Sequence, residues 1–126
     1  MTDQELLELA KKASERSYSP YSHFPVGAAL ECADGTIFTG CNVENAAYGE
    51  SICAERCAAL KAVSEGHRDF ARIAIWGKSQ DYCYPCGSCR QVLSEFSRDM
   101  TVVCARADGR FVSHKLSEMM PFVFDF

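Results

Sequence analysis

The chain has 126 residues, 48% of them hydrophobic and 24% charged, and its formal net charge is −4. This length corresponds to a single domain, residues 1–126, with room for a hydrophobic core that needs no disulfide bonds. The acidic balance argues against a nucleic-acid-binding protein, which needs a basic face, and no apolar run approaches the length of a membrane-spanning helix.

The N-terminal segment opens with Thr2-x-x-Glu5, a capping box that predicts an amphipathic helix over residues 3–16. This start differs from the basic and then apolar stretch of a secretory signal. The eight cysteines are therefore expected to be reduced thiols, some of them bound to metal, in a cytoplasmic protein.

Strands and helices alternate along the rest of the chain. A buried strand over 26–32, a turn at 33–35 and a return strand over 36–41 indicate a hairpin. Further strands are predicted over 70–76, 101–106 and 111–114, and further helices over 53–65, 86–97 and 117–120. The pattern indicates a layered α/β domain with a five-stranded mixed sheet. Arg72 is expected to be a surface charge.

A cysteine pattern in the middle of the chain points to a metal. Cys86 and Cys89 stand three residues apart at a predicted helix start after Pro85, so both sulfurs can face one point. The positive end of the helix dipole there favours thiolates. A third thiolate from Cys53 would complete a zinc site with one open position, which is the pattern of catalytic zinc.

Glu55 indicates what the open position is for. Residues two apart on a helix point roughly 200° apart, so Cys53 and Glu55 reach one pocket only if Cys53 lies just outside the helix. A carboxylate beside zinc-activated water is a natural general acid and base. A non-ligand Glu with a Pro-Cys-x-x-Cys half-site is also the known signature of zinc deaminases.

Spacing alone leaves two alternatives open. A closed structural zinc site can form from Cys53, Cys57, Cys86 and Cys89. A thioredoxin-like Cys-x-x-Cys is the other alternative, but it does not explain the sequence Cys53-Ala54-Glu55. Arg56 and Arg90 favour the catalytic site, because nearby guanidinium groups can offset the excess negative charge of three thiolates.

Four segments together resemble a known family. They are residues 21–30 (YSHFPVGAAL), 42–48 (NVENAAY), 53–56 (CAER) and 85–92 (PCGSCRQV). In this order and spacing the chain resembles the short, one-zinc cytidine deaminases of pyrimidine salvage, from about residue 15 to 125. The resemblance implies a three-layer α/β/α domain that deaminates free cytidine and deoxycytidine to uridine and deoxyuridine, with release of ammonia.

The resemblance also implies roles for the metal-site residues. One zinc ion per chain would be held by Cys53, Cys86 and Cys89 and would activate the water that attacks C4 of the pyrimidine. Glu55 would carry protons to N3 and to the leaving amine. Arg56 would neutralise part of the thiolate charge.

Substrate contacts follow from the same resemblance. Asn42 and Glu44 would bind a ribose hydroxyl, the backbone N–H of Ala54 would hold the 2-oxo oxygen, and Phe24 would form a wall of the base pocket. Read without the resemblance, Asn42 and Glu44 are equally compatible with ordinary turn residues, and a plain core position is the alternative for Phe24.

Tyr48 and Phe124 would complete the pocket of a neighbouring subunit, in a homotetramer whose active sites are shared between subunits. From the residues alone, an apolar tail that packs on its own domain is an equal explanation for Phe124.

Three other functions remain in competition. A deaminase of a cytosine-containing antibiotic such as blasticidin S shares the zinc motifs, but the pair Asn42-x-Glu44 argues against its different sugar. An RNA- or DNA-editing deaminase would need a basic track with stacking aromatics. A four-cysteine structural zinc module would bind a partner protein without catalysis.

Overall fold

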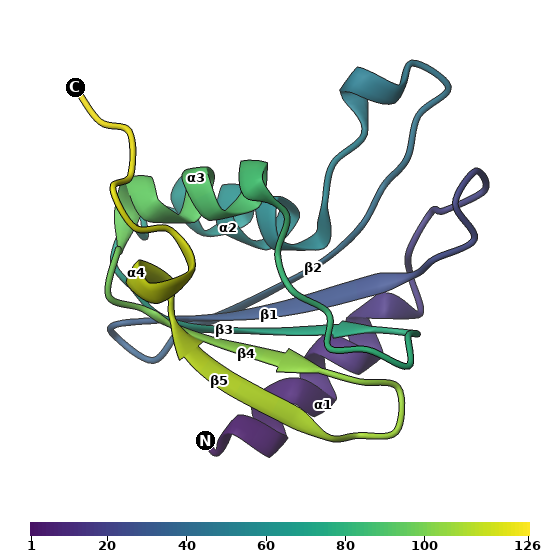
Figure 1. Cartoon of the computed structure of the whole chain (residues 1–126), viewed down its shortest axis with the longest axis horizontal. Coiled ribbons are helices and arrows are strands. Elements are labelled where there is room, and N and C mark those ends of the chain that lie inside the picture. Colours follow the sequence, from purple (N-terminus) through teal and green to yellow (C-terminus); the bar gives the residue numbers. More distant parts are fainter.

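A five-stranded mixed sheet forms the middle layer of the structure, a computed structural model that describes residues 1–126 (Figure 1). Its strand order is β2-β1-β3-β4-β5, and only β3 and β4 run parallel. The strands are β1 (Val26–Cys32), β2 (Ile37–Cys41), β3 (Phe70–Gly77), β4 (Thr101–Ala105) and β5 (Phe111–Lys115).

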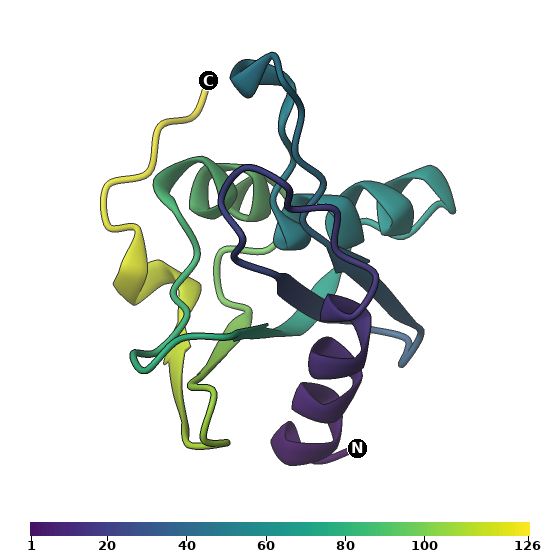
Figure 2. The same cartoon turned by 90° about the vertical axis from the view of Figure 1, so that its right-hand side faces the viewer.

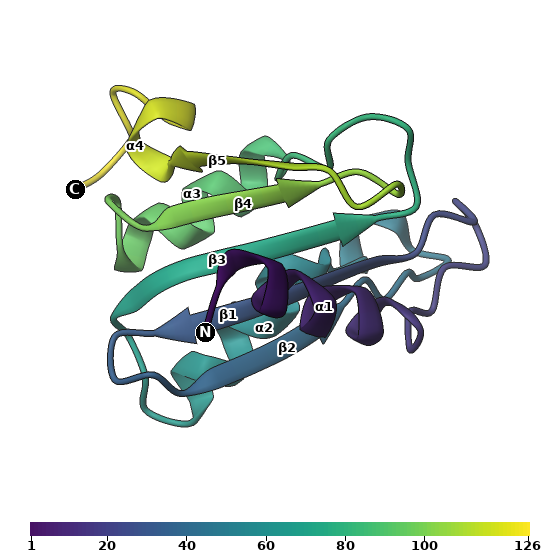
Figure 3. The same cartoon turned by 90° about the horizontal axis from the view of Figure 1, so that it is seen from below.

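Helices cover both faces of this sheet. Helix α1 (Asp3–Ser14) crosses one face, as the view from below shows (Figure 3), while α2 (Ala54–Ser64) and α3 (Gly87–Phe96) lie side by side on the other (Figure 1). A short helix, α4 (Leu116–Met119), follows β5. The predicted three-layer α/β/α domain is confirmed, and each predicted element is present with its ends within two residues of the prediction.

Two apolar clusters hold the three layers together. Along β1, Ala28 and Leu30 face α2 and α3, whereas Ala29 faces α1, because successive side chains of a strand point to opposite faces. Burial of these apolar side chains on both faces stabilises the domain without disulfide bonds. No helix combines the length and the apolar character that crossing a membrane requires.

Gly40 in β2 sets how closely α2 approaches the sheet. A Cβ at this position would lie 2.5 Å from the amide nitrogen of Ala58 and 2.7 Å from the carbonyl oxygen of Ala54. Both are backbone atoms of α2, so only glycine allows the first turns of the helix to lie against the strand. This contact fixes the start of α2, where Cys53 is located.

Two connecting segments extend beyond the sheet at the end where α2 begins (Figure 2). They are residues 17–25, between α1 and β1, and residues 42–52, which contain the 3-10 helix Tyr48–Glu50. Isolated bridges pair Tyr18 with Val43 and Val43 with Ile52. These bridges place Asn42 and Glu44, on either side of Val43, close to the segment that leads into Cys53.

Arg72 is not the surface charge that the sequence predicts. Its side chain is 16% exposed, and it forms ion pairs with Asp3 at 2.6 Å and with Glu31 at 2.9 Å. The hydrogen bond from Arg72 holds the pKa of Glu31 below its usual value, against the opposing effect of burial. The three residues therefore tie α1 to the central strands β1 and β3.

Candidate active site

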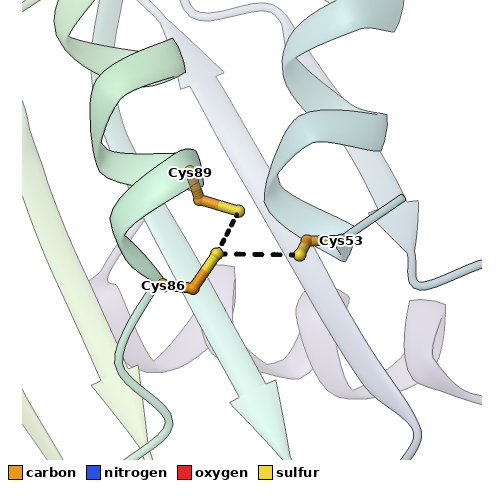
Figure 4. Close-up of side chains that lie close together, drawn as sticks. All are labelled: Cys53, Cys86 and Cys89. Atoms are coloured by element: carbon orange, nitrogen blue, oxygen red, sulfur yellow. Dashed lines mark hydrogen bonds between the residues drawn. The ribbon is translucent and has the colours of Figure 1, made fainter. Parts of the chain in front are cut away.

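Three cysteine sulfurs meet where α2 and α3 begin (Figure 4). Cys53 is the N-cap residue of α2 and Cys86 that of α3, while Cys89 lies in the first turn of α3. The Sγ atom of Cys86 lies 3.9 Å from that of Cys53 and 3.5 Å from that of Cys89. All three sulfurs lie within 4.8 Å of one another.

This spacing fits one zinc ion. Zinc–sulfur bonds are about 2.3 Å long, so two sulfurs on a tetrahedral zinc ion lie roughly 3.8 Å apart. The observed separations of 3.9 and 3.5 Å are close to that value. The N-cap positions also help, because the unpaired N–H groups and dipoles of both helices favour negatively charged sulfur.

The electrostatics of the cluster favour thiolates. Hydrogen bonds from Cys89 and Arg56 lower the pKa of Cys53 to about 5, against the effect of its burial. The same hydrogen bond raises the pKa of Cys89, because the proton of Cys89 is shared with Cys53. The chain thus carries negative charge at this point before metal binds, and zinc would displace the protons that remain.

Glu55 lies beside the cluster and is nearly inaccessible to solvent, with 4% of its surface exposed. Burial raises its pKa to about 7, and the nearby Cys53 thiolate adds to this effect. Cys53 has an extended backbone, with φ −74° and ψ 155°, and precedes the helix. This confirms the prediction that Cys53 lies outside the helix so that its side chain and that of Glu55 reach one place.

The closed four-cysteine site does not form. Cys57 is absent from the sulfur cluster and instead lies against β2, with its Cβ 2.9 Å from the position that a Cβ on Gly40 would occupy. Three sulfurs on a tetrahedral zinc ion would leave one position for water or substrate, as in catalytic zinc sites.

Asn42 and Glu44 form hydrogen bonds with the segment over residues 17–25. The Asn42 Oδ1 accepts from the Ser17 hydroxyl at 2.5 Å and from the Val26 N–H at 2.9 Å, and its Nδ2 donates to the Phe24 carbonyl at 2.9 Å. The Glu44 carboxylate accepts from the N–H groups of Tyr21 and Ser22, both at 3.0 Å, and from the Ser22 hydroxyl. Both residues therefore fix this segment in place.

Phe24 lies on the same side of the molecule as Glu55. A Cβ on Gly77 would lie 2.8 Å from the sulfur of Cys83 and 3.2 Å from the ring of Phe24, so both cover the end of β3. Burial raises the pKa of Cys83 to about 12, and the charge of Glu55 adds to it, which places this inert thiol near the carboxylate. Ala54, the first residue of α2, is buried and has an N–H that no residue within the helix accepts.

Tyr48 and Phe124 do not reach the cysteine cluster of their own chain. Tyr48 is 75% exposed and Phe124 67% exposed. The segment with the 3-10 helix Tyr48–Glu50 and the C-terminal tail rise at opposite ends of the molecule (Figure 1). Within one chain, Tyr48 contacts Tyr21 edge-on, and the carbonyl of Phe124 accepts from Gln91 at 3.1 Å.

Ser22 was missed by sequence reasoning. Its contacts with Glu44, 22 residues away, follow from the fold and leave no local signal in the sequence. Gly77 was missed as well, although an isolated glycine at a strand end is a known sign of close approach by another group.

Comparisons with known proteins identify the family to which the chain is similar. The model of the cytidine and deoxycytidylate deaminase zinc-binding region matches residues 1–106. A cytidine deaminase of Sporosarcina psychrophila is 44% identical over 98% of this chain and 92% of its own length. A blasticidin-S deaminase of Bacillus cereus is 29% identical over 97% of this chain and 91% of its own length.

The fold is also similar to that of a solved cytidine deaminase. The crystal structure of a cytidine deaminase from Burkholderia pseudomallei matches with a TM-score of 0.95 and 44% identity, over 98% of this chain and all of that one. The family match covers both cysteine half-sites and Glu55. The chain therefore belongs to the zinc-dependent cytidine and deoxycytidylate deaminase family.

Proposed function

We propose that the protein catalyses the hydrolytic deamination of free cytidine and deoxycytidine to uridine and deoxyuridine, with release of ammonia. One observation carries this proposal: a buried carboxyl group, Glu55, lies beside three sulfurs that leave one metal position open. The cytidine deaminases among the relatives support the choice of substrate.

Cys53, Cys86 and Cys89 would hold the zinc ion, one per chain. When bound, zinc supplies the Lewis acidity that makes water a nucleophile near neutral pH. Arg56 donates a hydrogen bond to the Cys53 sulfur at 3.4 Å. Its positive charge would offset part of the charge of three thiolates and so preserve that Lewis acidity.

Glu55 would carry the protons. It accepts a proton from the water whose oxygen forms the bond to C4, and it delivers a proton to N3 of the ring. It next takes the proton of the hydroxyl group now on C4 and delivers it to the amine; the C4–N bond then breaks, ammonia leaves, and C4 keeps its oxygen as a carbonyl. The burial of Glu55 suits this role, because a desolvated carboxyl group holds a proton more readily than an exposed one.

Asn42 and Glu44 would bind one sugar hydroxyl between them. The carbonyl oxygen of Asn42 already accepts two hydrogen bonds, and one of its two N–H groups is used, so one donor remains. Glu44 accepts three hydrogen bonds and has about one lone pair left, on Oε2. A hydroxyl that accepts from Asn42 and donates to Glu44 satisfies both.

The rest of the substrate would contact Phe24 and Ala54. The ring of Phe24, held over Gly77, would form one wall of the base pocket. The N–H of Ala54 points out of the helix start and would donate to the 2-oxo oxygen of the pyrimidine.

We further propose a homotetramer whose active sites are shared between subunits. The exposed aromatic side chains of the C-terminal tail and of the segment over residues 42–52 form apolar surface that a partner subunit would cover. Tyr48 and Phe124 would then complete the pocket of a neighbouring chain. The free state of all eight cysteines suits a cytoplasmic enzyme of pyrimidine salvage.

The decisive experiment follows cytidine by its ultraviolet absorbance, with zinc measured per chain. Loss of the cytidine band, stoichiometric ammonia and one zinc per chain are expected. Blasticidin S and a cytosine-containing oligonucleotide are tested in parallel, because turnover of either of them in place of the nucleosides would contradict the proposal.

A further inference from the structure

Ser22 contacts both the proposed ribose-binding carboxylate and the proposed wall of the base pocket. Its N–H donates to Oε1 of Glu44 at 3.0 Å, and its hydroxyl donates to Oε2 of the same carboxylate. The same hydroxyl accepts from the Phe24 N–H at 3.1 Å. We propose that Ser22 is a positioning residue that aims Glu44 at the sugar hydroxyl of the substrate, an inference that rests on the proposed function.

The hydrogen-bond geometry leaves Ser22 little freedom. A serine hydroxyl has one proton to donate, and here that proton points at Glu44 while the oxygen accepts from Phe24. Its orientation is therefore fixed from both sides. In Glu44, the oxygen Oε1 accepts hydrogen bonds from two backbone N–H groups, which use both of its lone pairs. The oxygen Oε2 accepts one hydrogen bond, from the Ser22 hydroxyl, and keeps one lone pair free. Ser22 is the residue that donates to both oxygens of this carboxylate, so it helps to set the direction in which the remaining lone pair of Oε2 points.

Glu44 lines a pocket that is open to solvent. Tyr21, Ser22, Glu44, Tyr48 and Ser51 line a pocket of about 320 Å³. The hydroxyl of Ser22 is the leading cause of a lowered pKa at Glu44, with the backbone N–H of Ser22 next. The hydrogen bonds of Ser22 therefore favour the ionised form of Glu44, and an ionised carboxylate can only accept hydrogen bonds. The substrate group at this position must be a donor, as a sugar hydroxyl is.

His23, between Ser22 and Phe24, has an unfavourable backbone conformation that the surrounding hydrogen bonds hold in place. Its φ of 56° lies in the left-handed region that residues other than glycine rarely adopt. The hydrogen bonds of Ser22 on one side and the His23 N–H bond to the Ser19 carbonyl at 3.0 Å hold this turn. The strained backbone of His23 lies next to Ser22, which binds both Glu44 and Phe24. Backbone strain of this kind is common at functional sites.

Ser22 could instead serve only to hold the loop, and the two roles predict different kinetics. A loop-holding role affects every substrate equally, whereas aiming Glu44 affects only substrates that have the hydroxyl. Because cytidine and deoxycytidine share only the 3′-hydroxyl on the ring of the sugar, 2′,3′-dideoxycytidine is the matched substrate that lacks it. The test therefore compares kcat/KM for cytidine and for 2′,3′-dideoxycytidine.

S22A is expected to lower kcat/KM for cytidine by about tenfold or more, mainly through KM, which corresponds to the loss of one charge-assisted hydrogen bond. For dideoxycytidine the change should stay below about twofold. S22T, which keeps the hydroxyl, should restore the cytidine value. S19A is the control in the same loop, because the Ser19 hydroxyl contacts only Ser17, and it should leave both substrates unchanged.

An equal loss for both nucleosides in S22A, or no loss for either, would overturn the proposal. If S22A does not fold, S22C retains the side-chain volume with a much weaker donor and is subject to the same comparison. If the wild-type protein turns over neither nucleoside, the proposed function itself fails, and the role of Ser22 in sugar binding fails with it.

Discussion

Arg56 lies in the first turn of α2 and donates a hydrogen bond from its Nη2 to the sulfur of Cys53, at 3.4 Å. The Nε of the same guanidinium is buried and has no partner within the chain. This contact places the positive charge of Arg56 next to the sulfur cluster.

R56Q should keep the fold and zinc but reduce kcat by about tenfold or more, because three uncompensated thiolates weaken the Lewis acidity of the metal. R56K, which keeps the charge, should lose less. Steady-state kinetics with zinc analysis test this, and R68Q, at an exposed arginine outside every ion pair, is the control. Equal activity of R56Q and wild type would contradict the assigned role.

E55Q should retain one zinc per chain and a native melting temperature but lose turnover by a factor of about 10²–10⁴, the usual contribution of general acid–base catalysis. The reason is that glutamine fits the same buried space but cannot accept a proton. Circular dichroism and zinc analysis confirm the fold. A structural zinc module would show no difference between E55Q and wild type in any of these measurements.

G40A should destabilise the protein by about 1–3 kcal/mol and weaken zinc binding, because the new methyl group meets backbone atoms of α2 that cannot move without shifting Cys53. Urea unfolding and zinc competition with a chelator measure the two effects. G49A, where a Cβ would meet nothing within 4 Å, is the matched control and should change neither. Lost stability with unchanged zinc affinity would show that Gly40 does not position the cluster.

Glu31 and Arg72 should make stability depend on pH in a defined way. The folded-state pKa of Glu31 lies below its unfolded value of about 4.5. The stabilisation by Glu31 is therefore complete above that unfolded value and is lost as pH falls through the folded value. At pH 7, E31Q should unfold at a lower urea concentration than the wild type, with a free energy of unfolding about 1–2 kcal/mol smaller. This difference in free energy should shrink below pH 4.

D34N is a control for this effect, because Asp34 is also a carboxylate with a lowered pKa but is exposed, with its main hydrogen bond to the Thr36 N–H in a turn. Its effect on the urea midpoint at pH 7 should be the smaller of the two. If the difference in unfolding free energy between E31Q and wild type stays constant from pH 7 to below pH 4, the ionised Glu31–Arg72 pair is not the cause of that difference.

F124A should lower activity without lowering the stability of the chain if its ring completes the pocket of a neighbouring subunit. In its own chain the ring is largely exposed and contacts Phe126, at 5.4 Å between ring centroids. Light scattering should give a mass of about 56 kDa for the wild type, four times the 14.0 kDa of one chain. A fully active monomer would contradict both the tetramer and the shared site.

The elements of the fold and the core of the site could be predicted from the sequence because both depend on short spacing. A helix start after Pro85 brings Cys86 and Cys89 together within one turn, whatever the rest of the chain does. The same holds for Cys53 and Glu55 at the start of α2. The order of strands and helices follows from periodicity in the same local way.

Contacts between distant residues were decided by the tertiary structure. Arg72 finds Glu31 because the antiparallel register of β1 and β3 places them directly opposite each other, and Ser22 meets Glu44 because a bridge at Val43 brings two loops together. The grouping of Cys89, and not Cys57, with Cys53 and Cys86 has the same origin, since α2 turns Cys57 toward β2. Local spacing determines which side chains share a turn, but only sheet register and helix packing determine which turns meet.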